Sequence, residues 1–164
     1  MGTTSEIAMN RICRSPGCGA PTTSRFSAYC SSHKARLRRH GAVDQEGITR
    51  ADLKPYLGRV RARMDKNPES PAWGHLDDRW RTLVGHAQSI LVGYRQGRAG
   101  PRHERIAAQE VVKLADAVEP RQVVETALAM FLMQELDPRR FRSDQAFRTQ
   151  LVRRIRGLTD LNAG

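Results

Sequence analysis

The stretch that decides the fold of this chain runs from Cys13 to Gly41 and reads CRSPGCGAPTTSRFSAYCSSHKARLRRHG. It holds all three cysteines of the 164-residue sequence, and the third of them is followed three positions later by a histidine. Thiolates and an imidazole arranged as two closely spaced pairs are the usual ligands of a tetrahedral zinc site. The sequence therefore predicts one structural zinc ion, since four protein ligands leave no position for water. The predicted ligands are Cys13, Cys18, Cys30 and His33.

The residues around these ligands favour the same interpretation. Pro16 and Gly17 lie between the first two cysteines and can turn the chain so that both thiolates face one ion. The second pair begins a helix that we predict over 30–40, because a glycine follows at position 41. A spacing of three residues places Cys30 and His33 on one face of that helix. A knuckle followed by a helix start predicts a treble-clef-like module over residues 1–45.

Other interpretations of the cysteines stay open. Three reduced cysteines can be buried beside an unrelated histidine without any metal. His40 can replace His33 as a ligand, although the start of the helix would then have to shift. Disulfides are disfavoured because the number of cysteines is odd and we recognise no secretory signal before them.

The stretch from Cys13 to Gly41 also resembles the short zinc module at the N-terminus of many phage and mobile-element proteins, some of which carry an HNH endonuclease domain. This resemblance covers about a fifth of the chain. It implies a setting in which the protein acts on DNA, with the four predicted ligands at the metal positions. The resemblance does not extend to the nuclease, because the remaining histidines at 75, 86 and 103 lie in helical sequence rather than in an HNH motif.

The charge of the chain favours a polyanionic partner. The sequence contains 28 Lys and Arg against 17 Asp and Glu, a formal net charge of +11. Residues 1–66 contribute 13 basic and 5 acidic side chains, so the excess is concentrated in this part. Such a distribution is typical of proteins that bind nucleic acid. No apolar run approaches the roughly 20 residues of a membrane span, so we expect a cytoplasmic protein that binds no membrane.

After the zinc module, helical periodicity predicts a mainly α chain with a domain of about four to five helices. We expect a basic helix and linker over 46–70, followed by a helical domain over 71–164. Thr49 is a candidate cap for a helix that runs to about Lys66. Pro55 either moves the expected start of this helix to 54 or 55 or divides a short turn from the helix proper. The further predicted helices cover about 76–96, 102–117, 121–135 and, after a cap at Ser143, 144–158.

The helix over 121–135 is apolar almost all round. We therefore expect Leu128 and Phe131 to be buried, either in the core of the monomer or at a contact between two copies. Together with the preceding helix it has the shape of a helix-turn-helix, but a helix this apolar is more often part of a core. A homo-oligomer or a protein partner that binds this helix stays open.

The sequence thus predicts a zinc-containing protein that binds nucleic acid, with duplex DNA favoured, as a regulator or accessory factor of a phage or mobile element. The alternative is an assembly factor in which zinc only stabilises a small lobe. We predict no enzyme, because no phosphate loop, nucleophile elbow or catalytic carboxylate pair is evident. A second basic cluster over 139–156 competes with the first for nucleic acid. The predicted nucleic-acid contacts are Arg14, Lys34, Arg36, Arg38, Arg39, Arg59 and Arg63.

Overall fold

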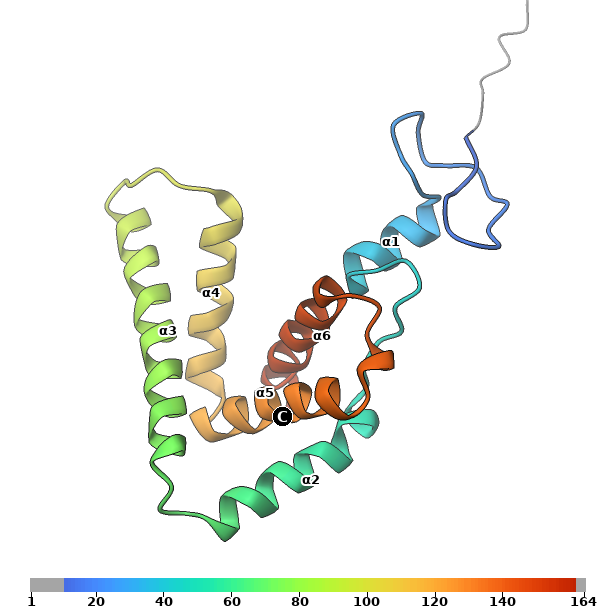
Figure 1. Cartoon of the computed structure of the whole chain (residues 1–164). Helices are drawn as coiled ribbons and strands as arrows, with labels where there is room; N and C mark the ends of the chain where they lie inside the picture. Colours follow the sequence, from blue (N-terminus) through green and yellow to red (C-terminus); the bar gives the residue numbers. More distant parts are fainter. Residues whose placement is uncertain (1–10, 162–164) are drawn as a thin grey trace, which may run out of the picture. The chain divides into compact units, whose positions relative to one another are not determined.

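A computed structural model describes residues 11–161, and helices dominate it (Figure 1). The prediction of a mainly α chain is confirmed. Within the described range the one extended pairing is an isolated bridge between Ile12 and Pro21. The elements are α1 (Ser31–His40), α2 (Arg50–Lys66), α3 (Pro71–Arg95), α4 (Arg102–Ala117), α5 (Pro120–Leu136), η1 (Pro138–Arg140), α6 (Asp144–Arg156) and η2 (Thr159–Leu161).

Residue contacts divide the chain into two compact units. The N-terminal unit combines the described residues up to Gly47 with Arg139–Gln150, and the helical unit combines Ile48–Pro138 with the residues from Leu151 onward. The division passes through α6. The helical unit contains α2 together with α3, α4 and α5. The domain boundaries expected at 45 and 70 stay predictions.

Helix α2 begins at Arg50, so the later start expected from Pro55 is wrong. Thr49 and Asp52 form a capping box, in which the Asp52 amide donates to Thr49 Oγ1 at 3.1 Å and the Thr49 amide donates to Asp52 Oδ2 at 2.8 Å. This cap satisfies two amide groups at the helix start. Pro55 lies beyond the first turn of α2, where it lacks the amide that would bond to the Ala51 carbonyl and its ring crowds that carbonyl, at a cost of about 3 kcal/mol.

Helix α3 begins at Pro71, five residues before the expected start at 76. Proline is favoured at the first position of a helix because its missing N–H has no partner there and its φ is already helical. The indole of Trp73 donates to the carbonyl of Asn67 at 2.7 Å and closes the turn between α2 and α3. Residues 67–70 of the predicted linker therefore form this tight turn, and Pro71 is the first residue of α3.

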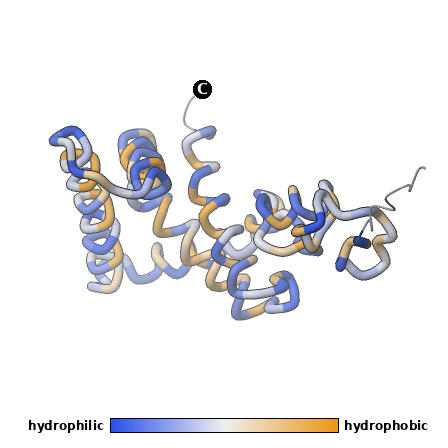
Figure 2. The backbone as a smooth tube through the Cα atoms, turned by 90° about the horizontal axis from the view of Figure 1, so that it is seen from above, coloured by the Kyte–Doolittle hydropathy of each residue, from blue (hydrophilic) through white to orange (hydrophobic). Residues whose placement is uncertain are grey.

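The core of the helical unit forms where α3 packs along α4 and α2 packs along α5. Trp80 of α3 meets Leu114, Val118 and Val123, which come from α4, the turn after it and the first turn of α5. Apolar and polar residues alternate along these helices, as amphipathic packing requires (Figure 2). No helix in the described range combines the length and hydrophobicity that crossing a membrane requires.

The first half of α5 is buried on all sides, whereas its second half is buried on one side only. Ala129, Met130 and Met133 have exposed fractions of 0, 0 and 1%, whereas Phe131 is 52% exposed and Leu128 is half-buried. The expectation that Phe131 belongs to the core of the monomer is therefore wrong. An apolar side chain does not by itself show which face of a helix is covered, because that depends on where α2 and α3 pack.

The N-terminal unit is built around two buried glutamines and a glycine. Gln150 Nε2 donates to the His40 carbonyl at 3.2 Å, and Gln45 Nε2 donates to the Arg140 carbonyl at 3.0 Å. Gly41 ends α1 with a φ of 87°. A Cβ atom at Gly41 would lie 2.7 Å from the Cα of Ala146, so only glycine allows the backbone of α6 to come this close. These contacts hold α1 against the first turns of α6 inside the unit.

Candidate metal centre and basic helix

The four predicted ligands come together in the N-terminal unit. One donor atom from each of Cys13, Cys18, Cys30 and His33 lies within 4.8 Å of the other three. Cys13 and Cys18 flank a tight turn, in which the Cys18 amide donates to the Ser15 carbonyl at 3.1 Å and Gly17 has a φ of 73°. The chain can adopt this turn because Pro16 and Gly17 occupy its two central positions. The predicted knuckle is thus present.

Distances between the donor atoms fit a single tetrahedral ion. Zinc bonds of 2.3 Å to sulfur and 2.0 Å to nitrogen place sulfur atoms about 3.8 Å apart, and sulfur and nitrogen about 3.5 Å apart. The Cys13 and Cys30 sulfurs lie 3.5 and 3.3 Å from His33 Nδ1, and the Cys18 and Cys30 sulfurs lie 4.0 Å apart. Soft thiolates with one imidazole suit zinc among the common divalent ions. The residues therefore fit a metal ion of this size.

The orientation of His33 is fixed from its other side. Its Nε2 lies 3.2 Å from the hydroxyl oxygen of Ser15, a residue that is buried. With Nδ1 directed to the sulfurs, Nε2–H donates to Ser15 Oγ, as metal-bound histidines donate to a second group. Ser15 carries this role, and the sequence did not single it out because nothing distinguishes it from the other serines of the module. His40 instead bonds to Gln150, which excludes it from the cluster in this structure.

Cys30 also begins α1. It is the N-cap residue, and its sulfur accepts a hydrogen bond from the His33 amide at 3.5 Å. A thiolate at this position satisfies a free amide and faces the positive end of the helix dipole. Helix α1 has no buried residue, so its own packing contributes little to its stability. The metal cluster at one end and the Gly41 contact at the other hold it in place.

The surroundings of the thiols favour a thiolate at Cys13. Burial raises the pKa of the Cys13 thiol, but backbone hydrogen bonds from Cys30 and Ser15 lower it by more, so that it falls to about 6. At Cys18 the backbone bond from Ala20 lowers the pKa, while burial and the neighbouring sulfurs outweigh it and raise the pKa. One sulfur is therefore ready to bind a metal near neutral pH, and the metal itself displaces the remaining protons.

Exposed basic side chains are concentrated in the N-terminal unit, which also holds the metal cluster. Arg14 and all four basic residues within α1 before His40 are exposed. Lys34, Arg36 and Arg38 form no ion pair with a carboxylate in the part of the chain that the structure describes. Between residue 11 and Gly47 there are seven Lys and Arg but only two acidic residues. The unit thus presents positive charge that the protein does not neutralise.

The other two predicted contacts lie in the helical unit. Arg59 and Arg63 are exposed and four residues apart on α2, so they share a face of that helix. Other arginines of this unit are held in ion pairs, among them Arg61 and Arg121, which both bond to the buried Glu125 at 2.8 Å. The structure therefore brings Arg14 and the α1 residues into one unit and assigns Arg59 and Arg63 to the other.

Comparisons with known proteins leave the site to be interpreted from its own chemistry. No protein-family model, no curated protein and no solved structure matches this chain.

Proposed function

We propose that this chain is a zinc-containing protein that binds duplex DNA through its N-terminal unit. Cys13, Cys18, Cys30 and His33 hold one structural zinc ion, and the ion fixes the first turn of α1. The basic side chains of α1, together with Arg14, then contact the phosphate backbone. Arg59 and Arg63 supply a second set of contacts from α2.

The exposed basic helix α1 is the observation that carries this proposal. A ten-residue helix without a buried side chain is marginal on its own, yet its N-cap is a ligand of the candidate metal centre. Side chains on a backbone that is already ordered lose less freedom when they bind. Lys34 and Arg38 are four residues apart and lie on one face, where they can follow a row of phosphates.

The balance of charge supports a polyanion rather than an acidic patch on a protein. Arg139–Gln150, which belongs to the same unit, adds four arginines and one aspartate to the positive excess. Phosphates are the densest regular array of negative charge that a protein meets, and their neutralisation releases counterions. Duplex DNA is favoured over single strands because Phe26 and Tyr29 are the aromatic residues of the module, too few for a stacking platform.

The test is a binding titration with duplex DNA, single-stranded DNA and structured RNA at several salt concentrations. Replacing Lys34 and Arg38 by Gln should weaken duplex binding and reduce the slope of log K against log salt by about 1.8, since two phosphate contacts are lost. The control is the double variant Arg79→Gln/Arg95→Gln, which removes the same charge from exposed positions of α3. Equal losses in both variants would contradict a specific role of α1.

The resemblance of residues 13–41 to modules of phage and mobile-element proteins supports a role as a regulator or accessory factor acting on DNA, including transcription. We place the protein in the cytoplasm, where thiols stay reduced and available to a metal. The chemistry proposed here needs no catalytic residue. A genome-wide footprint of the tagged protein that shows no enrichment over sheared input DNA would contradict this role.

A second candidate function rests on the exposed face of α5. Phe131 lines a groove of the helical unit together with Leu128, Leu132 and Trp73. This groove favours an assembly factor, either a homo-oligomer or one with a protein partner, in which zinc only stabilises the N-terminal unit. Salt separates the two functions, because an apolar contact is much less sensitive to salt than a phosphate contact. Sedimentation of the full chain across protein concentrations and salt tests this alternative.

A further inference from the structure

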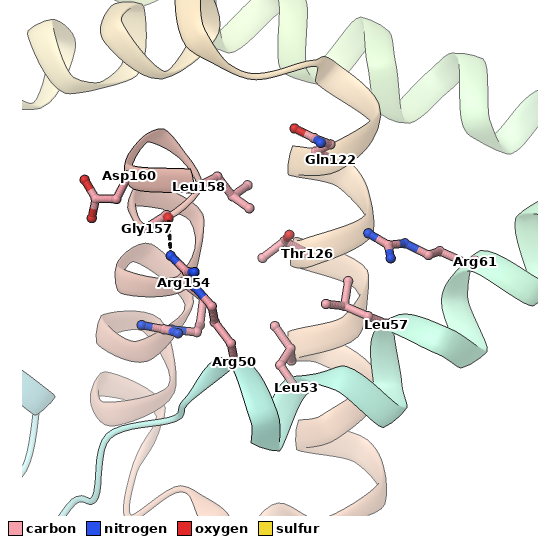
Figure 3. A pocket seen from close by; sticks show the side chains of 10 residues that line it. All are labelled: Arg50, Leu53, Leu57, Arg61, Gln122, Thr126, Arg154, Gly157, Leu158 and Asp160. Atoms are coloured by element: carbon pink, nitrogen blue, oxygen red, sulfur yellow. Dashed lines mark hydrogen bonds between the residues drawn. The ribbon is translucent and has the colours of Figure 1, made fainter. Parts of the chain in front are cut away.

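A pocket of about 250 Å³ lies within the helical unit, and three arginines line it. Figure 3 shows side chains from α2, from α5 and from the end of α6 around one space. Arg50 and Arg61 come from α2 and Arg154 comes from α6. Among the described residues, 11–161, the lining consists of Arg50, Leu53, Leu57, Arg61, Gln122, Thr126, Arg154, Gly157, Leu158 and Asp160.

The charges of this pocket are unevenly compensated. Arg61 donates to the buried Glu125 at 2.8 Å, so its charge is balanced within the protein. In the part of the chain that the structure describes, the acceptor for Arg50 is a neutral one, the carbonyl of Gly157 at 3.5 Å, which is the dashed line in Figure 3. Of the nearby carboxylates, Asp52 already accepts from the Thr49 amide and hydroxyl, and Asp160 is the one acidic side chain in the lining.

Arg154 gives the clearest indication of a ligand. Its Nε is buried and has no hydrogen-bond partner among the described residues. Burial, together with the neighbouring charges of Arg153 and Arg50, lowers the pKa of the Arg154 guanidinium. A buried donor without an acceptor is costly, and an oxyanion placed in the pocket would accept a hydrogen bond from Arg154 Nε–H and offset the repulsion from Arg50.

The remaining walls indicate what else the ligand carries. Leu53 and Leu57 of α2 and Leu158, which follows α6, contribute apolar surface to the lining, so a bare inorganic ion would leave this surface without a partner. The volume lies just below the usual range for drug-sized ligands, which favours a compact molecule. Guanidinium groups recognise phosphate and carboxylate equally through paired donors.

We propose that this pocket binds a small organic anion, in which a phosphate monoester or carboxylate group meets Arg154 and Arg50 and a short apolar group meets the three leucines. Glu125 keeps Arg61 in place at the rim. The site lies in the helical unit, so it does not depend on the proposed zinc site or on DNA binding by α1.

The test uses the full zinc-loaded chain and four probes: phenyl phosphate, benzoate, inorganic phosphate and phenol. We expect phenyl phosphate or benzoate to bind at one site, and whichever binds more tightly identifies the headgroup. Inorganic phosphate and phenol should each bind at least about tenfold more weakly, because each lacks one half of the ligand. An inorganic phosphate affinity equal to that of phenyl phosphate would contradict the apolar half, and an equal phenol affinity would contradict the anionic half.

Variants link the binding to the pocket. Arg154→Met keeps an apolar stem of similar length and should weaken the tighter probe at least about tenfold. The control Arg95→Met removes the same charge from an exposed position of α3 outside the pocket and should change little. Arg50→Met is a second pocket variant in case the first fails to fold. In the unchanged protein, the Nε–H resonance of Arg154 should shift on titration. The proposal would be overturned if neither organic probe bound with a Kd below about 10 mM, or if Arg154→Met and Arg95→Met bound the probe equally well.

Discussion

Cys30 allows the contribution of the metal to be separated from that of helix capping. Its sulfur is both a candidate ligand and the N-cap acceptor of α1. Cys30→Ser keeps an oxygen that can accept from the His33 amide but removes the soft ligand, while Cys30→Ala removes both. If the metal orders the unit, the two variants should be damaged almost equally. If capping alone matters, the serine variant should behave like the unchanged protein.

The expected magnitudes differ enough to decide between these cases. A polar N-cap contributes about 1 kcal/mol, whereas structural zinc in small modules contributes on the order of 10 kcal/mol. Helix α1 has no buried residue that could compensate for the loss of the metal. Both variants should therefore lose α1. This helix has 10 residues and makes up roughly a tenth of the helical part of the described chain, so the far-UV helical signal should fall by roughly that fraction.

The assay combines zinc analysis with hydrogen exchange of the peptide that covers α1. In both variants we expect zinc binding to be lost and the α1 amides to exchange freely, while the amides of α3 and α4 stay protected. Ser32→Ala, at an exposed position of the same helical turn, is the matched control and should retain zinc and protection. Full protection of α1 in Cys30→Ser together with loss in Cys30→Ala would refute the reasoning.

Three further changes test neighbouring parts of the structure. Ser15→Ala removes the acceptor for His33 Nε2 and should lower zinc affinity by about 10- to 100-fold in competition with a chromophoric chelator, without abolishing binding. Gly41→Ala should destabilise the N-terminal unit by about 1–3 kcal/mol in denaturant unfolding, whereas Gly58→Ala, in open space on α2, should stabilise slightly. Met130→Ala should cost about 2–5 kcal/mol and Phe131→Ala less than about 1 kcal/mol, since the first side chain is fully buried and the second is half-exposed. Equal costs at Met130 and Phe131 would mean that the face of α5 bearing Phe131 is covered in solution.

Local features of the chain could be predicted because the residues that produce them are neighbours in sequence. The spacing of the three cysteines and His33 was sufficient to predict the cluster. The sequence predicted Thr49 as the cap of α2 and Ser143 as the cap of α6. Both are confirmed, and Ser143 Oγ accepts a hydrogen bond from the Ala146 amide at 3.1 Å. For the two caps the physical cause lies within four residues of its effect, and the four ligands of the cluster lie within one segment, residues 13–33.

Features that depend on distant residues could not be predicted in this way. Gln150 and His40 are 110 positions apart, yet their contact helps to define the N-terminal unit. The exposure of Phe131 depends on which side of α5 the helix α2 covers, and the sequence of α5 alone shows no such preference. The grouping of Arg50 with Arg154 in one pocket depends likewise on how α2 and α6 are placed within the helical unit.

The central claim, that zinc orders a basic unit which then binds duplex DNA, is tested most directly by one titration. Binding of the full chain to a DNA duplex is measured across salt concentrations, first zinc-loaded, then after chelation, then after zinc is restored. We expect tight binding with a steep salt slope in the zinc-loaded protein. Chelation should cause a large, reversible loss of affinity and a smaller slope, because the α1 contacts disappear. Duplex binding with the same affinity and slope before and after zinc removal would contradict it.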